Sequence, residues 1–276
     1  LGDLLRSGEP DGGGRLMRFG RDLPHAPSPL SSVLPPSTNV PYGLRDLQGY
    51  NALADRKLGD ALETAWKESV FSHGIWTGRR IVAPDREAAL EHPLMDALSV
   101  RAAVSGRPFR AAGWVAQPSS GFVLQRNLES LPRVRLVAGG VGVSENRMRT
   151  LLAAGSFDPE GLVYWVGEGT AGADQAPTGT AWVSRDDWNE LVVRATTDAE
   201  ALLVVADSWS DGWTATVDGA PAEILRVYGL VRGVVLPAGD HVVRMTYVPP
   251  GFRLGAVLSL LGLALAGTAL AVGRGS

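Results

Sequence analysis

The sequence predicts an α+β protein, in which a mixed α/β sheet domain is followed by a small antiparallel β-sandwich and one C-terminal transmembrane helix. Three observations predict this class. Short apolar strands alternate with helical patterns over residues 40–168, strands without helices fill residues 179–252, and an uncharged apolar run closes the chain. The 34 glycines and 18 prolines are typical of a loop-rich fold built on short strands rather than of a helical bundle.

Composition excludes several classes of function. A formal net charge of -3 with mixed signs, and no basic stripe interleaved with aromatic residues, argues against nucleic acid as a partner. The absence of cysteine excludes disulfides and thiolate metal sites. The chain starts at Leu1 with no basic and then apolar leader, so we expect an upstream part to precede it.

The first half of the chain is predicted to be a connector followed by the mixed domain. Residues 1–39 are rich in glycine and proline and are predicted to be an extended connecting segment, with one strand-like island from Arg15 to Phe19. In the domain at 40–168, Leu58 to Val70 has the spacing of an amphipathic helix. The strand candidates of this domain are Arg80–Ala83, Val100–Val104, Phe122–Gln125, Arg133–Ala138 and Leu162–Val166.

A second helix is predicted from Glu145 to Ala154, because Ser144 is a favourable N-cap. Just before it, Gly140-Val141-Gly142 imitates the opening of a dinucleotide-binding fingerprint. The third glycine position holds Glu145, whose charge would oppose a pyrophosphate. We therefore interpret these glycines as a turn between strand and helix, and we expect no cofactor.

The second half is predicted to begin after a linker at residues 169–178. The sandwich at 179–252 contains Asp218-Gly219, a strong hairpin signal, and a continuous apolar strand from Ala201 to Ala206. Its other strand candidates are Glu190–Thr196, Trp213–Val217, Leu225–Val235 and His241–Val248.

Residues 253–276 are predicted to be the transmembrane helix and a short tail. The nineteen residues from Leu254 to Val272 carry no charge. As a helix they would reach about 28 Å, close to the roughly 30 Å hydrocarbon core of a bilayer. Arg253 and Arg274 bracket the run, so loop charge does not favour either orientation.

Several stretches together resemble the YfhO family of bacterial membrane proteins. The strongest is the block ADSWSDGWTATVDGAPAEILRVYGLVRGVVLPAGDHVVRMTYVPPGFRLG at 206–255, directly followed by the apolar run. The other stretches are Tyr42–Leu53, His92–Arg101, Leu131–Val137 and Phe157–Pro159.

This resemblance implies a polytopic protein related to GT-C glycosyltransferases, which use lipid-linked sugars. The present sequence would be the last extracytoplasmic region and the last helix, with the bulk of the chain outside the cytoplasm at a bacterial cell membrane. The family's catalytic acidic residue would lie in an early loop that is absent here, so no catalytic residue is expected. The implied partners are the membrane and a lipid-linked sugar or a cell-envelope glycan acceptor. The alternative is a membrane-anchored carbohydrate-binding or surface-interaction module.

Four residues are the candidates for ligand binding: Trp209, Asp211, Asp46 and Tyr50. Trp209 and Trp213 flank a turn that contains Asp211, and an aromatic face beside a carboxylate can stack on a sugar ring. We expect Trp213 to lie in the sandwich core and Trp209 to be more exposed. Loop aspartates, among them Asp207 and Asp240, are more typical of turns than of acid/base chemistry. The four histidines have no metal-binding spacing, so no metal site is expected.

Overall fold

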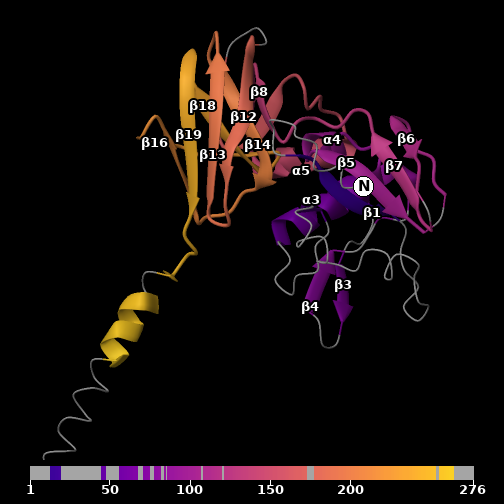
Figure 1. Ribbon diagram of the computed structural model, residues 1–276, viewed down its shortest axis with the longest axis horizontal. Helices are drawn as coiled ribbons and strands as arrows, with labels where there is room; N and C mark the ends of the chain where they lie inside the picture. The colour runs from indigo at the N-terminus through magenta and orange to yellow at the C-terminus, as the bar shows by residue number, and fades with distance from the viewer. Residues whose placement is uncertain are drawn as a thin grey trace, which may run out of the picture.

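The computed structural model describes residues 13–19, 45–47, 56–67, 71–74, 78–81, 84, 86–106, 108–119, 121–172, 177–252 and 255–263. This part of the chain is mostly β-sheet with few helices, which agrees with the predicted class at that level. Figure 1 shows the sandwich strands beside a half that combines a sheet with helices, and a C-terminal helix that projects away from both.

The N-terminal sheet has the strand order β2-β1-β5-β7-β6. Strand β1 pairs in parallel with both of its neighbours, whereas β7 is antiparallel to β5 and to β6. The strand-like island at residues 15–19 is therefore an inner strand of a sheet and not an isolated piece of connector. The strands are β1 (Arg15–Phe19), β2 (Arg45–Asp46), β5 (Val100–Ser105), β6 (Trp114–Gln117) and β7 (Val123–Asn127).

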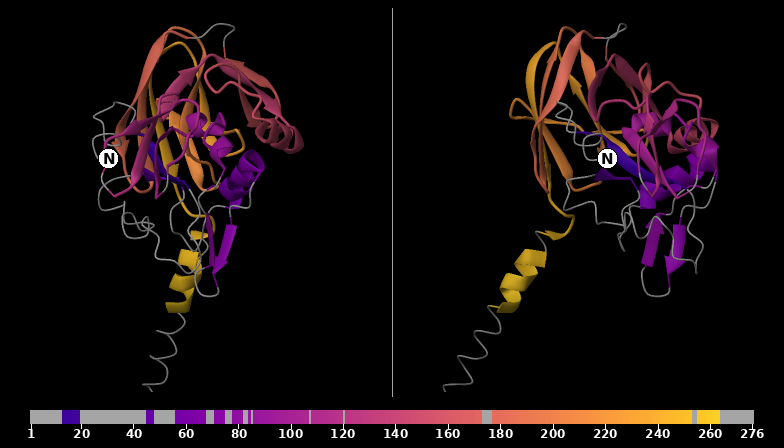
Figure 2. Two further views of the ribbon diagram at one scale, coloured as in Figure 1. Left: turned by 90° about the vertical axis from the view of Figure 1, so that its right-hand side faces the viewer. Right: turned by 45° about the vertical axis from the view of Figure 1, so that its right-hand side comes forward.

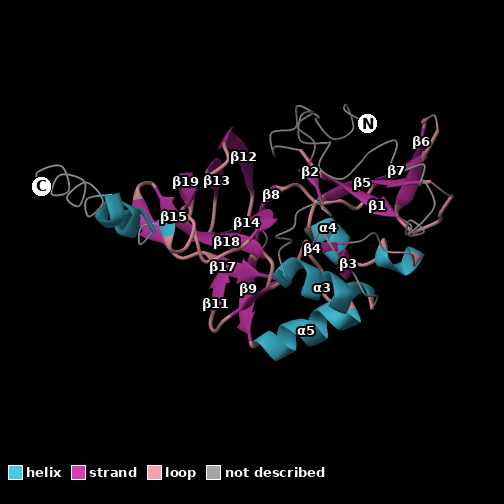
Figure 3. Cartoon of the chain, turned by 90° about the horizontal axis from the view of Figure 1, so that it is seen from below, coloured by secondary structure: helices cyan, strands magenta, loops and turns pink. Residues whose placement is uncertain are grey.

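Helices pack beside this sheet and enclose a core with it (Figure 3). Helix α3 (Arg56–Trp66) buries Leu62 and Trp66, as its apolar spacing predicts. Helix α5 (Glu145–Ala154) begins where predicted, because the Ser144 hydroxyl accepts a hydrogen bond from the Arg147 backbone N–H. The short elements are η2 (Glu87–Ala89), α4 (Leu94–Ala97) and the hairpin of β3 (Phe71–Gly74) and β4 (Gly78–Ile81).

A seven-stranded sheet joins the two halves of the molecule, in the order β11-β9-β10-β17-β18-β14-β8. It takes strands from both sides of the predicted linker, and one of them lies at 170–172 within that linker. Its strands are β8 (Val134–Val137), β9 (Gly139–Val143), β10 (Val163–Val166), β11 (Thr170–Gly172), β14 (Ala201–Ser208), β17 (Leu225–Val227) and β18 (Val231–Leu236).

A five-stranded antiparallel sheet covers one part of the seven-stranded sheet and forms the sandwich with it (Figure 2). Its order is β12-β13-β19-β15-β16. Leu191, Val193 and Met245 from this sheet pack against Val205 and Val234 of the other. The strands are β12 (Gly179–Asp186), β13 (Glu190–Thr197), β15 (Trp213–Val217), β16 (Ala220–Ala222) and β19 (Gly239–Tyr247).

Strand β14 is buried on both faces, which explains its continuous apolar sequence. Leu203 and Val205 belong to the sandwich core, whereas Leu202 and Val204 belong to the core shared with the helices and the N-terminal sheet. Successive side chains of a strand point to opposite faces, so one strand serves as the wall between two cores.

The interpretation of Gly140-Val141-Gly142 as a turn was wrong. These residues lie in β9, between β10 and β11. A Cβ on Gly140 would lie 2.5 Å from the Val163 carbonyl oxygen, and one on Gly142 would lie 2.4 Å from the Glu168 carbonyl carbon. The glycines therefore permit close approach of neighbouring backbone.

Two tight turns shape the sandwich hairpins. Asp218 and Gly219 both have positive φ, 52° and 87°, and connect β15 to β16 as predicted. Tyr228 and Gly229 have φ of 51° and 71° and divide the predicted strand 225–235 into β17 and β18. The second turn escaped prediction because tyrosine is an unusual residue at positive φ.

The C-terminal helix is described over residues 255–263, where every side chain is exposed. Within the described residues, no helix has the length and apolar character needed to cross a bilayer. The predicted span at 254–272 extends into residues outside the described part, so the transmembrane helix stays a prediction.

Candidate functional site

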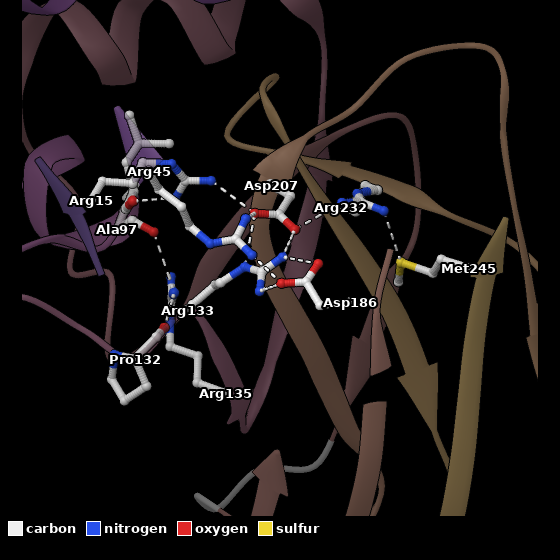
Figure 4. A network of polar contacts seen from close by, with 11 residues as sticks. Arg15, Arg45, Ala97, Pro132, Arg133, Arg135, Asp186, Asp207, Arg232 and Met245 are labelled. Atoms are coloured by element: carbon white, nitrogen blue, oxygen red, sulfur yellow. Dashed lines mark hydrogen bonds and ion pairs between the residues drawn. The ribbon is translucent and has the colours of Figure 1, made fainter. Parts of the chain in front are cut away.

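An arginine–aspartate network lies where the three large sheets meet (Figure 4). Two aspartates and four arginines form it; five of them lie on five different strands, and Arg133 immediately precedes a sixth. The members are Arg15 of β1, Arg45 of β2, Arg133 beside β8, Asp186 of β12, Asp207 of β14 and Arg232 of β18.

A bulge at the end of β14 positions Asp207. The pairing of β14 with β18 shifts register between Val205 and Ser208, and the Ala206 N–H donates to the Arg133 carbonyl oxygen at 2.8 Å. A bulge redirects the side chains of its strand. Asp207 was expected in a loop; instead it is the last-but-one residue of a strand, with a side chain only 13% exposed.

The Asp207 carboxylate accepts four hydrogen bonds from three guanidinium groups. Its Oδ1 accepts from Arg15 Nη2 at 2.8 Å and from Arg133 Nε at 3.0 Å. Its Oδ2 accepts from Arg133 Nη2 at 2.6 Å and from Arg232 Nη2 at 3.0 Å. Arg133 thus binds the carboxylate in a bidentate manner, which makes an arginine–carboxylate pair strong and fixes its orientation.

Asp186 extends the network toward the surface. Arg133 Nη1 donates to Asp186 Oδ2 at 2.8 Å, and Arg45 Nη2 contacts the same oxygen. Arg45 Nη1 also lies 3.9 Å from Asp207 Oδ1. The side chains of Arg45 and Asp186 are 30% and 35% exposed, whereas that of Arg133 is 2% exposed. The network therefore has a buried centre at Arg133 and Asp207 and a half-exposed edge.

Charge explains the state of each group. Burial acts to raise the pKa of Asp207, but the guanidinium groups of Arg133, Arg15 and Arg232 outweigh it and hold that pKa well below its usual range. Burial lowers the pKa of Arg15 and of Arg232 to about 10, so both stay charged at neutral pH. Asp207 is thus a permanent anion that neutralises buried cations.

The arrangement cross-links sheets rather than preparing an acid or a base. A general base must offer a free lone pair near its operating pH. Both oxygens of Asp207 already accept from cations, and its pKa is low. The network instead attaches β1 and β2 to both sheets of the sandwich, through residues far apart in sequence.

Two tryptophans near the network lie beneath cations. Lys57 Nζ lies 4.1 Å from the centroid of the Trp209 ring, and the Arg226 guanidinium carbon lies 5.5 Å from it. The Arg232 guanidinium carbon lies 3.9 Å from the centroid of the Trp213 ring. The two shorter distances, from Lys57 to Trp209 and from Arg232 to Trp213, are typical of cation–π contacts.

Comparison with known protein families gives a match over part of the chain. Residues 175–259 match the model of a family described as bacterial membrane protein YfhO. The YfhO resemblance is confirmed over these residues. No curated protein and no solved structure matches the chain. The match associates the chain with a family of bacterial membrane proteins.

The YfhO-matching segment, residues 175–259, holds half of the network. Asp186, Asp207 and Arg232 lie inside it, whereas Arg15, Arg45 and Arg133 lie upstream. The strongest polar contacts of the network cross this boundary. The segment is therefore bound to the upstream chain by buried charge as well as by the shared strand β14.

The four sequence-predicted ligand residues do not form one described cluster. Trp209 is half-buried beneath Lys57, and Asp211 is exposed in the turn before β15. The backbone of Asp46 lies in β2, next to Arg45 of the network, and its side chain is not described. Tyr50 lies outside the described residues. Their role in ligand binding stays a prediction.

Trp213 follows its prediction more closely. It is half-buried, packs against the sandwich core, and its ring centroid lies 5.3 Å from that of Tyr247. Asp240 was expected in a loop; instead it is the second residue of β19, where it accepts a hydrogen bond from the Thr196 hydroxyl at 2.6 Å.

Sequence reasoning missed Asp96, whose carboxyl group has an unusual pKa. Burial raises the pKa of Asp96 to about 6, the hydrogen bond from Asn127 opposes the rise, and the nearby charges of Glu129 and Glu160 add to it. Asp96 lies in the His92–Arg101 stretch, so the resemblance marked its neighbourhood but not the group itself. The described residues contain no group of three or more side chains placed to hold a metal ion.

Proposed function

We propose that the chain is the C-terminal extracytoplasmic region of a polytopic membrane glycosyltransferase of the YfhO and GT-C type, which uses lipid-linked sugar. In this role it carries no catalytic group and covers the transferase core or holds the acceptor. The observation that carries the proposal is the family match, which runs through the sandwich and into the exposed apolar helix.

Two features of the structure support a supporting rather than a catalytic role. The carboxylate of Asp207, whose pKa is held far below its usual range, accepts hydrogen bonds on both oxygens from three guanidinium groups. The network also joins the sheets into one unit, which suits a body that must hold its shape above a membrane. The C-terminal helix exposes apolar side chains such as Leu258 and Leu260, 59% and 67% exposed, and a run of this kind is typical of a surface that contacts lipid or another protein.

Topology is the first test of the proposal. The chain has no cysteine, so Ala238→Cys and Ser276→Cys each introduce one thiol. Ala238 is exposed in the loop before β19. In intact cells that produce the full-length parent protein, an impermeant thiol reagent should label Ala238→Cys and leave Ser276→Cys unlabelled until the cells are opened. The reverse pattern would place the sandwich in the cytoplasm and refute the proposal.

Catalysis is the second test. The chain alone, in detergent with lipid-linked sugar donors, should give no transfer product. Turnover that is lost on changing Asp96 to Asn would make Asp96 a catalytic residue and would end the supporting-role proposal.

A further inference from the structure

Trp188 is the most exposed large apolar side chain that the structure describes, at 93%. It lies in the turn Asp187–Asn189 between β12 and β13, here called the β12–β13 turn, which the Asp187 N–H closes by donating to the Glu190 carbonyl oxygen at 2.8 Å. A tryptophan at a hairpin tip gains nothing from folding when it remains in water, because burial is what stabilises such a side chain.

The β12–β13 turn lies at the end of the sandwich from which the chain departs toward its C-terminal helix. Strand β13 pairs with β19 so that Glu190 faces Thr246, and the Tyr247 N–H donates to the Asn189 carbonyl oxygen at 2.8 Å. Tyr247 is the last residue of β19. Figure 1 shows the C-terminal helix leaving from this same end.

The connector between β19 and the helix is short. The Phe252 N–H donates to the Pro249 carbonyl oxygen at 3.1 Å, so residues 249–252 form a tight turn. Such a turn brings its ends within about 7 Å. The two residues from Tyr247 to Pro249 add about 7 Å at most. Tyr247 is therefore held within about 14 Å of Phe252. The Gly255 N–H donates to the Gly251 carbonyl oxygen at 2.8 Å, so the helix starts directly from this turn.

The connector exposes apolar side chains, and arginine–carboxylate pairs lie on the strands beside the β12–β13 turn. Phe252 is 64% exposed and Val248 is 39% exposed. Arg185 and Arg244 lie on strands next to the β12–β13 turn, with side chains 60% and 49% exposed, and they pair with Asp187 and Glu190. Long arginine side chains can lay their stems along an apolar layer and keep the charge in water.

We propose that the β12–β13 turn docks into the headgroup layer of the bilayer, with Trp188 as its anchor. The inference rests on the proposed function, because it takes the C-terminal helix to lie in that bilayer. Tryptophan is enriched at membrane–water interfaces, where its ring is apolar and its N–H finds polar partners. The occupant is lipid because Trp188 lies at the end of the sandwich from which the chain leads, through the exposed side chains of Val248 and Phe252, into the exposed apolar helix.

This second point of attachment fixes the orientation of the sandwich. A single helix with a short connector leaves the sandwich free to rotate about the helix axis. A turn anchored on the neighbouring side removes that freedom, and thereby sets which edge of the molecule faces the membrane.

The test uses the environment-sensitive fluorophore NBD on single cysteines in the full chain, reconstituted into vesicles of phosphatidylethanolamine and phosphatidylglycerol. Asn189→Cys reports on the β12–β13 turn without removing Trp188. Leu258→Cys reports on the helix. Ala238→Cys is the matched control, because it lies in an exposed loop at the opposite end of the nine-residue strand β19.

The expected result is a blue shift of emission, with quenching by a nitroxide carried on the lipid headgroup, at Asn189→Cys but not at Ala238→Cys. Replacing Trp188 by Ser should abolish the shift at Asn189→Cys while the shift at Leu258→Cys remains. Equal urea midpoints with and without the Trp188→Ser change would show that the fold is intact.

The other outcomes separate the two proposals. A shift at Leu258→Cys with Asn189→Cys behaving like Ala238→Cys would overturn the docking of the turn and leave the membrane helix in place. A shift at Asn189→Cys that survives Trp188→Ser would overturn the anchoring role of Trp188. The absence of a shift at Leu258→Cys would refute the proposal that the C-terminal helix lies in the membrane, and with it the docking of the turn.

Discussion

Replacing Asp207 with Asn should destabilise the fold severely, because it removes the charge that neutralises the buried centre of the network. The change leaves Arg15, Arg133 and Arg232 without their shared anion, and an amide can accept at only one of its two terminal atoms. At least two charge-assisted hydrogen bonds are lost, at about 1.5–3 kcal/mol each. Removing one partner of a buried ion pair typically costs about 3–5 kcal/mol, and we expect Asp207→Asn to fall in that range.

Urea unfolding of the chain in mild detergent, followed by tryptophan fluorescence, measures this cost from the midpoint and the slope. Asp187→Asn is the matched control. Asp187 also pairs with an arginine, but both side chains are exposed, so this change should leave the midpoint almost unmoved. The double variant Asp207→Asn with Arg232→Met should lose less stability than the two single variants lose together. The reason is that Arg232→Met removes one of the cations that Asp207→Asn leaves unpaired.

The pH dependence of the Asp207 effect has a definite sign. The pKa of Asp207 is lower in the folded chain than in the unfolded chain, where it is about 3.9. Its contribution is therefore complete above about pH 4 and is lost as the pH falls further. The stability difference between the original chain and Asp207→Asn should be constant from pH 7 to pH 4 and should narrow below that. A cost as small as that of Asp187→Asn would refute the view that the network holds the sheets together.

Three further comparisons test the fold. Arg133→Met should lower the free energy of unfolding by about 3 kcal/mol or more, whereas Arg135→Met should leave it unchanged or raise it in urea melts. The difference arises because Arg135 is buried with its Nε and Nη2 unbonded among the described residues. An equal cost at both positions would contradict this reasoning. Asp96→Asn should stabilise the chain by about 1 kcal/mol at pH 7 and not at pH 4. Because the folded chain raises the pKa of Asp96 to about 6, ionising this carboxyl lowers the stability of the fold as the pH rises from about 4 to about 6. An equal gain at both pH values would show that the carboxyl is not its source. Trp213→Ala should cost about 2–3 kcal/mol and Trp209→Ala about 1 kcal/mol by the same melts, since only Trp213 packs against the sandwich core; similar losses would show that Trp209 is a core residue too.

Periodicity was a good guide wherever one core decided the pattern. The helix at 145–154 and the strands at 100–105 and 190–197 lie within a residue or two of their predicted limits, because local signals and burial agree there. The hairpin at Asp218-Gly219 was predictable from two residues alone. The glycines of β9 were misread because their reason is close approach by other strands, and no local pattern contains that information.

The network was invisible in the sequence for a related reason. Arg15 and Asp207 are separated by 192 positions and meet only because β1 is inserted into the N-terminal sheet beside the sandwich. Asp207 follows an apolar strand, which is an ordinary place for a turn-forming aspartate. Only the bulge in β14 turns it inward. By contrast, the family resemblance identified the C-terminal part of the chain correctly, because consecutive residues carry that resemblance.

The double role of β14 limits how the molecule can be divided. An isolated piece beginning at residue 175 would keep the strand but lose β8, its partner along Leu202–Val205, and would expose Leu202 and Val204 to solvent. Such a piece would present an unpaired sheet edge next to an apolar face, the combination that drives chains to associate edge to edge. Expression trials that follow the limits of the family match should therefore yield aggregates, and a soluble fragment needs its start placed upstream of Arg133.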